Sequence, residues 1–306
     1  MSGFGPQVEV TIARVRADIA KRHADLVKYG LVVWTGGNVS GRVPGADLFV
    51  IKPSGVGYDE LAPENMILCD LDGNAVAGTP GSEQAPSNDT ATHAYVYRNM
   101  PEVGGIVHTH STYASAWAAR GQQIPCVIAP MAAEFGGPVP VGPVSTIGDD
   151  SIGRGIVETL ADHRSRAVLM RNHGPFTIGA TARDAVKAAV LLEDVARTVH
   201  LATEGGTVEP MLQGEVDGLF SRAQLAGTRS RSAGRAKSAK AAAKSSAKAA
   251  ATTAKPTKAA KTTKTTHSTT TKATAAATTA APASTATTPQ TGAAASDARQ
   301  KVADRR

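Results

Sequence analysis

Residues 104–111 read GGIVHTHS, and the order of residue types in this stretch indicates a buried strand that ends at a chemical site. Two small residues are followed by Ile106 and Val107, and then by two histidines at alternate positions. Alternate residues of a strand point to the same face of a sheet, so His108 and His110 can reach one metal ion. We therefore predict a strand over residues 104–110 with a metal site at its end.

Two further side chains extend this candidate metal site. His173, in RNHGPF, follows a second apolar run, and Asp89, in PSNDTATH, precedes a helical pattern. Three imidazoles and one carboxylate suit Zn²⁺, and Mn²⁺ or Co²⁺ less selectively. If the carboxylate moves away, a position opens for a substrate oxygen, as a catalytic zinc site requires. A single histidine in a strand is more often structural, so the prediction depends on the combination of these residues.

The chain of 306 residues divides by composition into an acidic body and a basic tail. Residues 1–227 carry 17 Lys and Arg against 24 Asp and Glu, whereas residues 228–306 carry 16 against 2. The tail contains no Phe, Tyr, Trp, Leu or Ile, so it cannot bury enough apolar area to offset its chain entropy. We expect one domain over residues 1–227, followed by a disordered tail over residues 228–306.

The composition also restricts the partners and the compartment. Closely spaced cations in the tail predict non-specific, salt-sensitive contact with nucleic acid, and a solubilising extension is the alternative interpretation. The two cysteines, Cys69 and Cys126, form no CxxC motif and fit a reducing compartment. No apolar run approaches the length of a membrane span, and the N-terminus has no signal-peptide pattern. We expect a cytoplasmic protein that does not contact the membrane.

Apolar periodicity predicts interleaved helices and short strands in the body. The expected helices cover residues 8–29, 90–99, 112–120, 151–163 and 181–204. The expected strands cover residues 31–34, 48–51, 66–71, 104–110, 167–170 and 176–178, with a loop over residues 35–41. Because several short strands follow one another directly, a mixed or antiparallel sheet flanked by helices is favoured over a doubly wound dinucleotide fold.

Three loops of small and hydroxyl-bearing residues predict an anion site. They read TGGNVS at 35–40, KPSG at 52–55 and PSND at 86–89. Glycine lets backbone N–H groups approach an anion closely, while Ser, Asn and the Lys52 ammonium add donors. None of the loops matches a Walker A or GxGxxG fingerprint, and each alone is ordinary turn chemistry. Loops of this kind, if they converge, suit a phosphate monoester.

Taken together, these motifs resemble the class II aldolase/adducin family. They are TGGNVSGR, IKPSGVGYDEL, PSNDTATHAYVY, GGIVHTHS, the Ile-Pro pair at 124–125 and RNHGPFTIG, all in the expected order. The resemblance covers about residues 8–204 and is greatest to the branch of L-ribulose-5-phosphate 4-epimerases. It implies an α/β fold, namely a three-layer α/β/α sandwich with a largely antiparallel central sheet. It also implies a homotetramer with active sites at subunit boundaries.

The same resemblance implies roles for individual residues. His108, His110 and His173 would be metal ligands, and Asp89 would be a fourth ligand or a nearby acid/base. The substrate phosphate would be held by Gly37, Asn38, Ser54, Gly55, Ser87 and Asn88, with Lys52 nearby. His93, on the helix after Asp89, is interpreted as a packing residue or a support for the ligands.

The chain departs from the epimerase pattern at the proton-transfer groups. The epimerases carry an Asp where this chain has Ala133, and a C-terminal Tyr, supplied across the subunit boundary, where it has Gly227. Phe220 stands in place of a His, and no tyrosine follows Tyr113. Glu134 is a candidate replacement for the missing Asp, and a solvated loop carboxylate is the alternative interpretation.

The leading hypothesis is a metal-dependent sugar-phosphate epimerase of the L-ribulose 5-phosphate to D-xylulose 5-phosphate type. It would work by retro-aldol cleavage and re-addition. An aldolase or decarboxylase that acts on another phosphorylated sugar or sugar acid is the first alternative. A non-catalytic, adducin-like binding protein with a polyanion-binding tail is the second. The missing Asp and Tyr favour this last hypothesis, whereas the retained metal ligands argue against it.

Overall fold

The computed structural model describes residues 3–228. The helices are α1 (Pro6–Lys28), α2 (Thr90–Asn99), α3 (Thr112–Arg120), α4 (Ala129–Phe135), α5 (Ser151–Leu160) and α6 (Ala182–Glu204), and a further helical segment covers residues 213–228. The strands are β1 (Asn38–Arg42), β2 (Leu48–Ile51), β3 (Ile67–Asp70), β4 (Gly105–His108), β5 (Val141–Gly142), β6 (Ala167–Met170) and β7 (Gly174–Gly179). The predicted disorder of the tail and its predicted contact with nucleic acid concern residues that, from 229 on, lie outside the described part.

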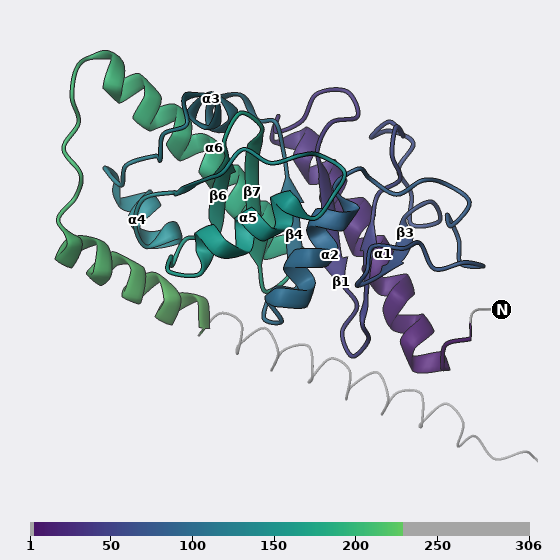
Figure 1. Ribbon diagram of the computed structural model, residues 1–306. Coiled ribbons are helices and arrows are strands. Elements are labelled where there is room, and N and C mark those ends of the chain that lie inside the picture. The colour runs from purple at the N-terminus through teal and green to yellow at the C-terminus, as the bar shows by residue number, and fades with distance from the viewer. Residues whose placement is uncertain (1–2, 229–306) are drawn as a thin grey trace, which may run out of the picture. The chain divides into compact units, whose positions relative to one another are not determined.

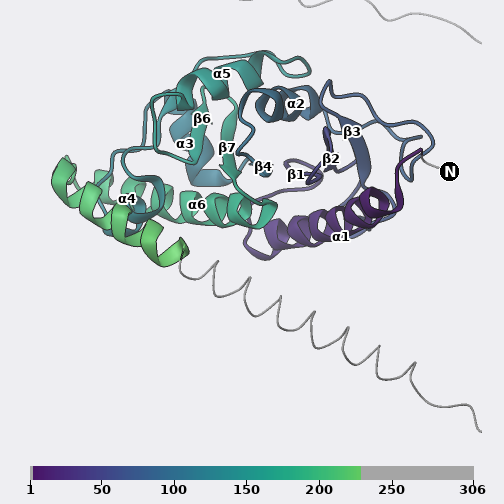
Figure 2. The ribbon, with the colours of Figure 1, turned by 90° about the horizontal axis from the view of Figure 1, so that it is seen from below.

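The seven strands form one sheet that is covered by helices on both faces (Figures 1 and 2). Helices α2 and α5 pack against each other on one face, and α1 and α6 cover the other (Figure 2). The apolar residues of the body fill the two spaces between these layers and the sheet. The predicted three-layer α/β/α sandwich is confirmed. Among residues 3–228, no helix combines the length and the apolar character that crossing a membrane requires.

The sheet is largely antiparallel, as predicted. Its strand order is β3-β2-β1-β4-β7-β6-β5, and only the edge pair β5–β6 is parallel. Strand β4 therefore lies in the middle of the sheet, between β1 and β7. Its last residue, His108, pairs with Asn38 on β1 and with Phe176 on β7. This register places the C-terminal end of β4 beside the N-terminal ends of β1 and β7.

Two sequence-based assignments around residue 35 are wrong. Residues 31–34 are not a strand, because Trp34 has a left-handed backbone (φ 57°) and a turn is closed by a 3.1 Å hydrogen bond from Gly36 N–H to Val33 O. The loop expected over residues 35–41 instead contains most of β1. Its sequence, NVSGR, has little apolar character, and its pairing with β2 and β4 makes it a strand. The glycine at position 41 lets β1 lie close to α1, because a Cβ there would be only 2.7 Å from Ile19 Cδ1.

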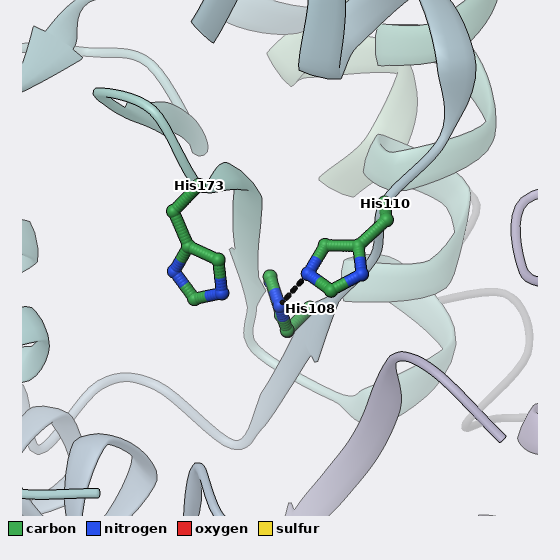
Figure 3. Close-up of side chains that lie close together, drawn as sticks. All are labelled: His108, His110 and His173. Carbon is green, nitrogen blue, oxygen red and sulfur yellow. Dashed lines mark hydrogen bonds between the residues drawn. The ribbon is translucent and has the colours of Figure 1, made fainter. Parts of the chain in front are cut away.

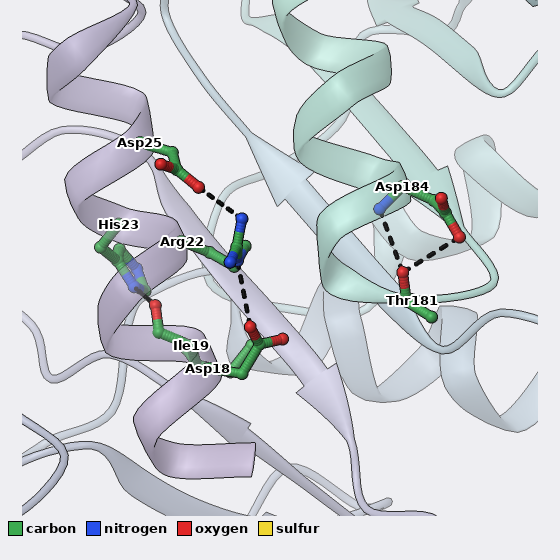
Figure 4. Close-up of polar contacts among 7 residues, drawn as sticks. All are labelled: Asp18, Ile19, Arg22, His23, Asp25, Thr181 and Asp184. Carbon is green, nitrogen blue, oxygen red and sulfur yellow. Dashed lines mark hydrogen bonds and ion pairs between the residues drawn. The ribbon is translucent and has the colours of Figure 1, made fainter. Parts of the chain in front are cut away.

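His23 makes two hydrogen bonds inside the core, one within α1 and one that connects α1 to β1. Its Nδ1–H donates to Ile19 O at 2.9 Å (Figure 4), and its Nε2 accepts the N–H of Val39 at 3.0 Å. Because Nε2 is an acceptor, the imidazole must be neutral. Burial accordingly lowers the pKa of His23 to about 3.

We expect His23 to make the folded protein less stable in mild acid. The unfolded chain protonates this imidazole below its ordinary pKa of 6.5, whereas the folded chain keeps it neutral down to about pH 3. Because the pKa of His23 is lower in the folded chain, its contribution to the free energy of unfolding is complete above pH 6.5. This contribution falls by about 1.4 kcal/mol for each pH unit below that value. Urea unfolding at neutral pH and near pH 5 should show a smaller loss for His23→Gln than for the wild type, and equal losses would contradict the assignment.

Candidate functional site

The residues predicted to bind metal and phosphate meet at one cavity of about 230 Å³. It lies beyond the ends of β1, β2 and β4, next to the turns that precede α2 and β7. The predicted residues that line it are Gly37, Asn38, Lys52, Ser54, Gly55, Ser87, Asn88, Asp89, His108, His110 and His173. Of the predicted site residues, only Glu134 is not among them.

Three imidazoles converge in this cavity (Figure 3). His108 ends β4, His110 follows two residues later, and His173 lies in the turn between β6 and β7. One ring nitrogen of each lies within 4.8 Å of those of the other two. The Nε2 atoms of His108 and His110 are 3.0 Å apart. The Nδ1–H of His108 donates to Pro175 O at 3.0 Å, so its Nε2 carries the lone pair and lies toward His110 in the cavity.

The state of these imidazoles fits a divalent metal ion. Burial lowers the pKa of His108 to about 3 and also lowers the pKa of His173, so both rings are neutral near pH 7. A neutral imidazole offers a lone pair to a metal. Among the described residues, His173 Nδ1 is buried and has no hydrogen-bond partner. The convergence of the three rings, the neutral state of His108 and His173, and the unpaired nitrogen of His173 fit the donor set that zinc and related ions bind.

Asp89 adds a carboxylate to the same cavity but is not part of the close histidine cluster. It immediately precedes α2, and its Oδ2 accepts a 2.7 Å hydrogen bond from Asn38 Nδ2. The same amide donates to Ser87 Oγ at 3.0 Å, so Asn38 holds two cavity residues in place. Burial acts to raise the pKa of Asp89, but His108, His93 and the Asn38 amide outweigh it and hold the pKa below its ordinary value.

Close packing fixes the histidine-bearing segments. The ring of His108 stacks on Phe176, with centroids 4.1 Å apart and planes 14° apart. A Cβ at Gly174 would lie 2.7 Å from Thr109 O, and one at Gly37 would lie 2.9 Å from His108 O. These two glycines are therefore needed for close approach, and Gly37 also has a positive φ of 78°.

His93 lies in the core and is not one of the three clustered histidines. Its ring is fully buried, and its Nδ1 hydrogen-bonds with Ser40 Oγ at 2.6 Å. It contacts Asp89 at the start of α2, where its N–H donates to Asp89 O, and it is one of the groups that lower the pKa of the Asp89 carboxyl.

Sequence reasoning missed three residues around the cavity. Ile147 lines it from the Gly- and Pro-rich segment 121–148, where no periodicity marks a position. Phe176 was assigned to a strand but not to the site. Tyr58 lies behind the loop that contains Gly36 and Gly37, and its hydroxyl donates to both carbonyls. Its place in the IKPSGVGYDEL motif was the one available signal.

Glu134 does not line the cavity that contains the histidines. It is on α4, is only 8% exposed, and its Oε2 accepts a 2.5 Å hydrogen bond from Lys187 Nζ. It is therefore neither a loop residue nor solvated. It lines a second cavity, of about 600 Å³, together with Ala133 and Gly227. Ala133 and Gly227, the positions at which the epimerases carry an Asp and a Tyr, thus line a cavity separate from that of the histidines.

The comparisons with known proteins agree with this geometry. The family model described as "Class II Aldolase and Adducin N-terminal domain" matches residues 17–200. The L-ribulose-5-phosphate 4-epimerase UlaF of Salmonella paratyphi B is 38% identical over 200 residues, which cover 62% of this chain and 85% of that protein.

Two solved structures extend the likeness to the fold. An L-fuculose 1-phosphate aldolase is 25% identical and has a TM-score of 0.63, covering 68% of this chain and 95% of the other. YgbL from Klebsiella pneumoniae is 27% identical and has a TM-score of 0.59, covering 68% and 98%. With a family model that spans more than half of its length and a fold that agrees, the chain belongs to the class II aldolase and adducin family.

Proposed function

We propose that the protein is a metal-dependent enzyme that epimerises a sugar phosphate at C4, of the L-ribulose 5-phosphate to D-xylulose 5-phosphate type. The observation that carries this proposal is the convergence, at one cavity, of three histidines and the three loops predicted to bind an anion. The likeness to the epimerase UlaF supports it.

The loops provide a place for the phosphate end of the substrate. Lys52 is 2% exposed and lines the cavity. Its Nζ donates to Thr35 O at 2.8 Å, which holds the ammonium beside the loop at 35–37. Ser54 and Ser87 supply hydroxyls. Gly36, Gly37 and Gly55 let backbone N–H groups approach the phosphate oxygens. A dianionic phosphate compensates the buried charge of Lys52, whose pKa is lowered by burial.

The histidines provide a place for the reacting end. His108, His110 and His173, with Asp89 as the fourth ligand or an adjacent base, would hold Zn²⁺, or Mn²⁺ or Co²⁺ in its place. When bound, the ion supplies Lewis acidity toward the ketone and the adjacent hydroxyl of a ketose phosphate.

The reaction moves one proton and one carbon–carbon bond. The C4 hydroxyl loses its proton as the C3–C4 bond breaks, and the electron pair stays on the three-carbon fragment as an enediolate. The two-carbon fragment is then an aldehyde, and re-addition to its opposite face inverts C4 and returns the proton. Asp89, held by the Asn38 amide, is the carboxylate at this cavity that can accept that proton.

A second proton-transfer group would have to come from another copy of the chain. Glu134 lines a different cavity of its own chain, so it can act at the histidine cavity only if subunits place the two cavities together. We propose a homotetramer with sites at subunit boundaries, as the family resemblance implies. In this arrangement Glu134 takes the place of the missing Asp.

Cleavage without return is the second candidate function. No tyrosine follows Tyr113, and Ala133 and Gly227 carry no group that transfers protons. One positioned acid/base typically contributes about 10²–10⁴-fold to the rate, so re-addition would be slowed more than fragment release. This observation favours an aldolase that acts on a phosphorylated sugar.

The test is NMR of the zinc- or manganese-loaded protein incubated with L-ribulose 5-phosphate. Appearance of D-xylulose 5-phosphate supports the epimerase, and Glu134→Gln then tests the second proton-transfer group. Accumulation of dihydroxyacetone and glycolaldehyde phosphate supports the aldolase instead. An unchanged substrate in the presence of bound metal contradicts both reactions for this sugar.

A further inference from the structure

Three consecutive carbonyls of the loop at 35–37 are held by two side chains. Lys52 Nζ donates to Thr35 O at 2.8 Å, and the Tyr58 hydroxyl donates to Gly36 O at 2.8 Å and to Gly37 O at 3.1 Å. The single hydroxyl proton is therefore shared between neighbouring carbonyls. A short Gly-Gly segment, which is intrinsically the most mobile kind of backbone, is thus fixed at every carbonyl.

This arrangement determines which side of the loop faces the cavity. The three loop residues line the cavity, whereas Tyr58 does not, so its hydroxyl acts from behind the loop. In a trans peptide the C=O and the N–H point in opposite directions, so the N–H of Gly37 is turned away from Tyr58. The N–H of Gly36 is already bonded to Val33 O. The loop thus offers the Gly37 N–H to an anion and keeps the neighbouring carbonyl oxygens, which would repel it, on the far side.

The ring of Tyr58 is held independently of its hydroxyl. It packs against the His23 ring, with centroids 5.9 Å apart, and the Lys52 ammonium lies 5.2 Å from its centroid. Burial raises the pKa of Tyr58 above its ordinary value of 10, so the hydroxyl stays protonated and remains a donor near neutral pH. Removal of the oxygen alone therefore leaves the ring contacts in place.

We propose that Tyr58 is a positioning residue for the bound phosphate, because its hydroxyl fixes the Gly36–Gly37 backbone with its donor side toward the cavity. The inference rests on the proposed function in that the ligand is a phosphorylated sugar. It adds a residue that does not contact the ligand but raises the affinity of the loop and Lys52 for the phosphate.

The test compares Tyr58→Phe with the wild type in three titrations: zinc into metal-free protein, and inorganic phosphate and L-ribulose 5-phosphate with metal-loaded protein. We expect the Kd for inorganic phosphate to rise about 3- to 10-fold, the cost of losing one hydrogen bond that orders the loop. The affinity for Zn²⁺ should be unchanged, because Tyr58 contacts none of the histidines that face the cavity. With L-ribulose 5-phosphate, KM should rise more than kcat falls.

Tyr95→Phe is the matched control, since the Tyr95 ring lies on α2 against Arg98 and Arg154, away from the cavity. It should leave all three titrations unchanged. Phosphate binding to Tyr58→Phe that equals that of the wild type would overturn the inference. A joint loss of zinc affinity, phosphate affinity and thermal stability would also overturn it, because the role would then be structural. If the wild type does not convert the sugar, the phosphate and zinc titrations still decide the role of Tyr58.

Discussion

Replacing His110 by alanine is expected to lower the affinity for divalent metal by more than about 100-fold and to abolish turnover. Loss of a residue that only orients a ligand already costs about 10–100-fold, so loss of a ligand must cost more. His110 supplies one of the three clustered nitrogens and is itself exposed, so its truncation leaves the core intact. Zinc titration of metal-free protein, together with the NMR assay, measures both effects.

The controls separate metal loss from general damage. His163→Ala removes an exposed imidazole outside the cavity and should change neither metal affinity nor turnover. His108→Ala should act in the same direction as His110→Ala, with an added loss of stability because its ring is buried against Phe176. Unchanged zinc affinity in His110→Ala would show that the three histidines are not the metal site.

Replacing Asp89 by asparagine is expected to reduce kcat by about 10²–10⁴-fold. The amide keeps the size of the side chain but can neither accept a proton nor supply a negative charge. Because Asp89 is held by the Asn38 amide, the substitution changes the chemistry at a position that is already ordered. Turnover at saturating metal measures the effect, with Asp72→Asn, at a side chain that is 79% exposed, as the control.

The same variant distinguishes the two roles proposed for Asp89. A ligand role predicts that zinc affinity falls together with kcat. A role confined to proton transfer predicts that kcat falls while zinc affinity is retained. A kcat equal to that of the wild type would exclude Asp89 from the reaction.

Much of the fold follows from local pattern. The long amphipathic runs give α1 and α6 with ends close to those predicted, and the apolar runs give β2, β3 and β6. Strand β1 could not be predicted, because NVSGR becomes a strand only through partners that are distant in sequence. Helix α4 was missed for a related reason. Its seven residues contain Pro130 and several alanines, and its apolar face is defined by contacts with α6 and other segments that are distant in sequence.

The site was predicted as a set of segments and not as a geometry. Residue types and spacing were enough to bring the histidines and the three loops to one cavity. The amide of Asn38 that bridges Asp89 and Ser87, the stacking of His108 on Phe176 and the hydroxyl of Tyr58 depend on distances between strands and loops. Glu134 shows the limit most clearly, because its sequence position gave no indication that Lys187 would bind it.

The cavity takes its lining from segments near residues 37, 54, 88, 109 and 173, which only the complete sandwich brings together. A metal held there binds the folded chain and not the unfolded one, so occupancy and folding share one equilibrium. At about 100 times its Kd, such a ligand adds about 2.7 kcal/mol to the free energy of unfolding. If the cavity holds a metal as we propose, we expect starvation for the ion to deplete the protein itself as well as its activity.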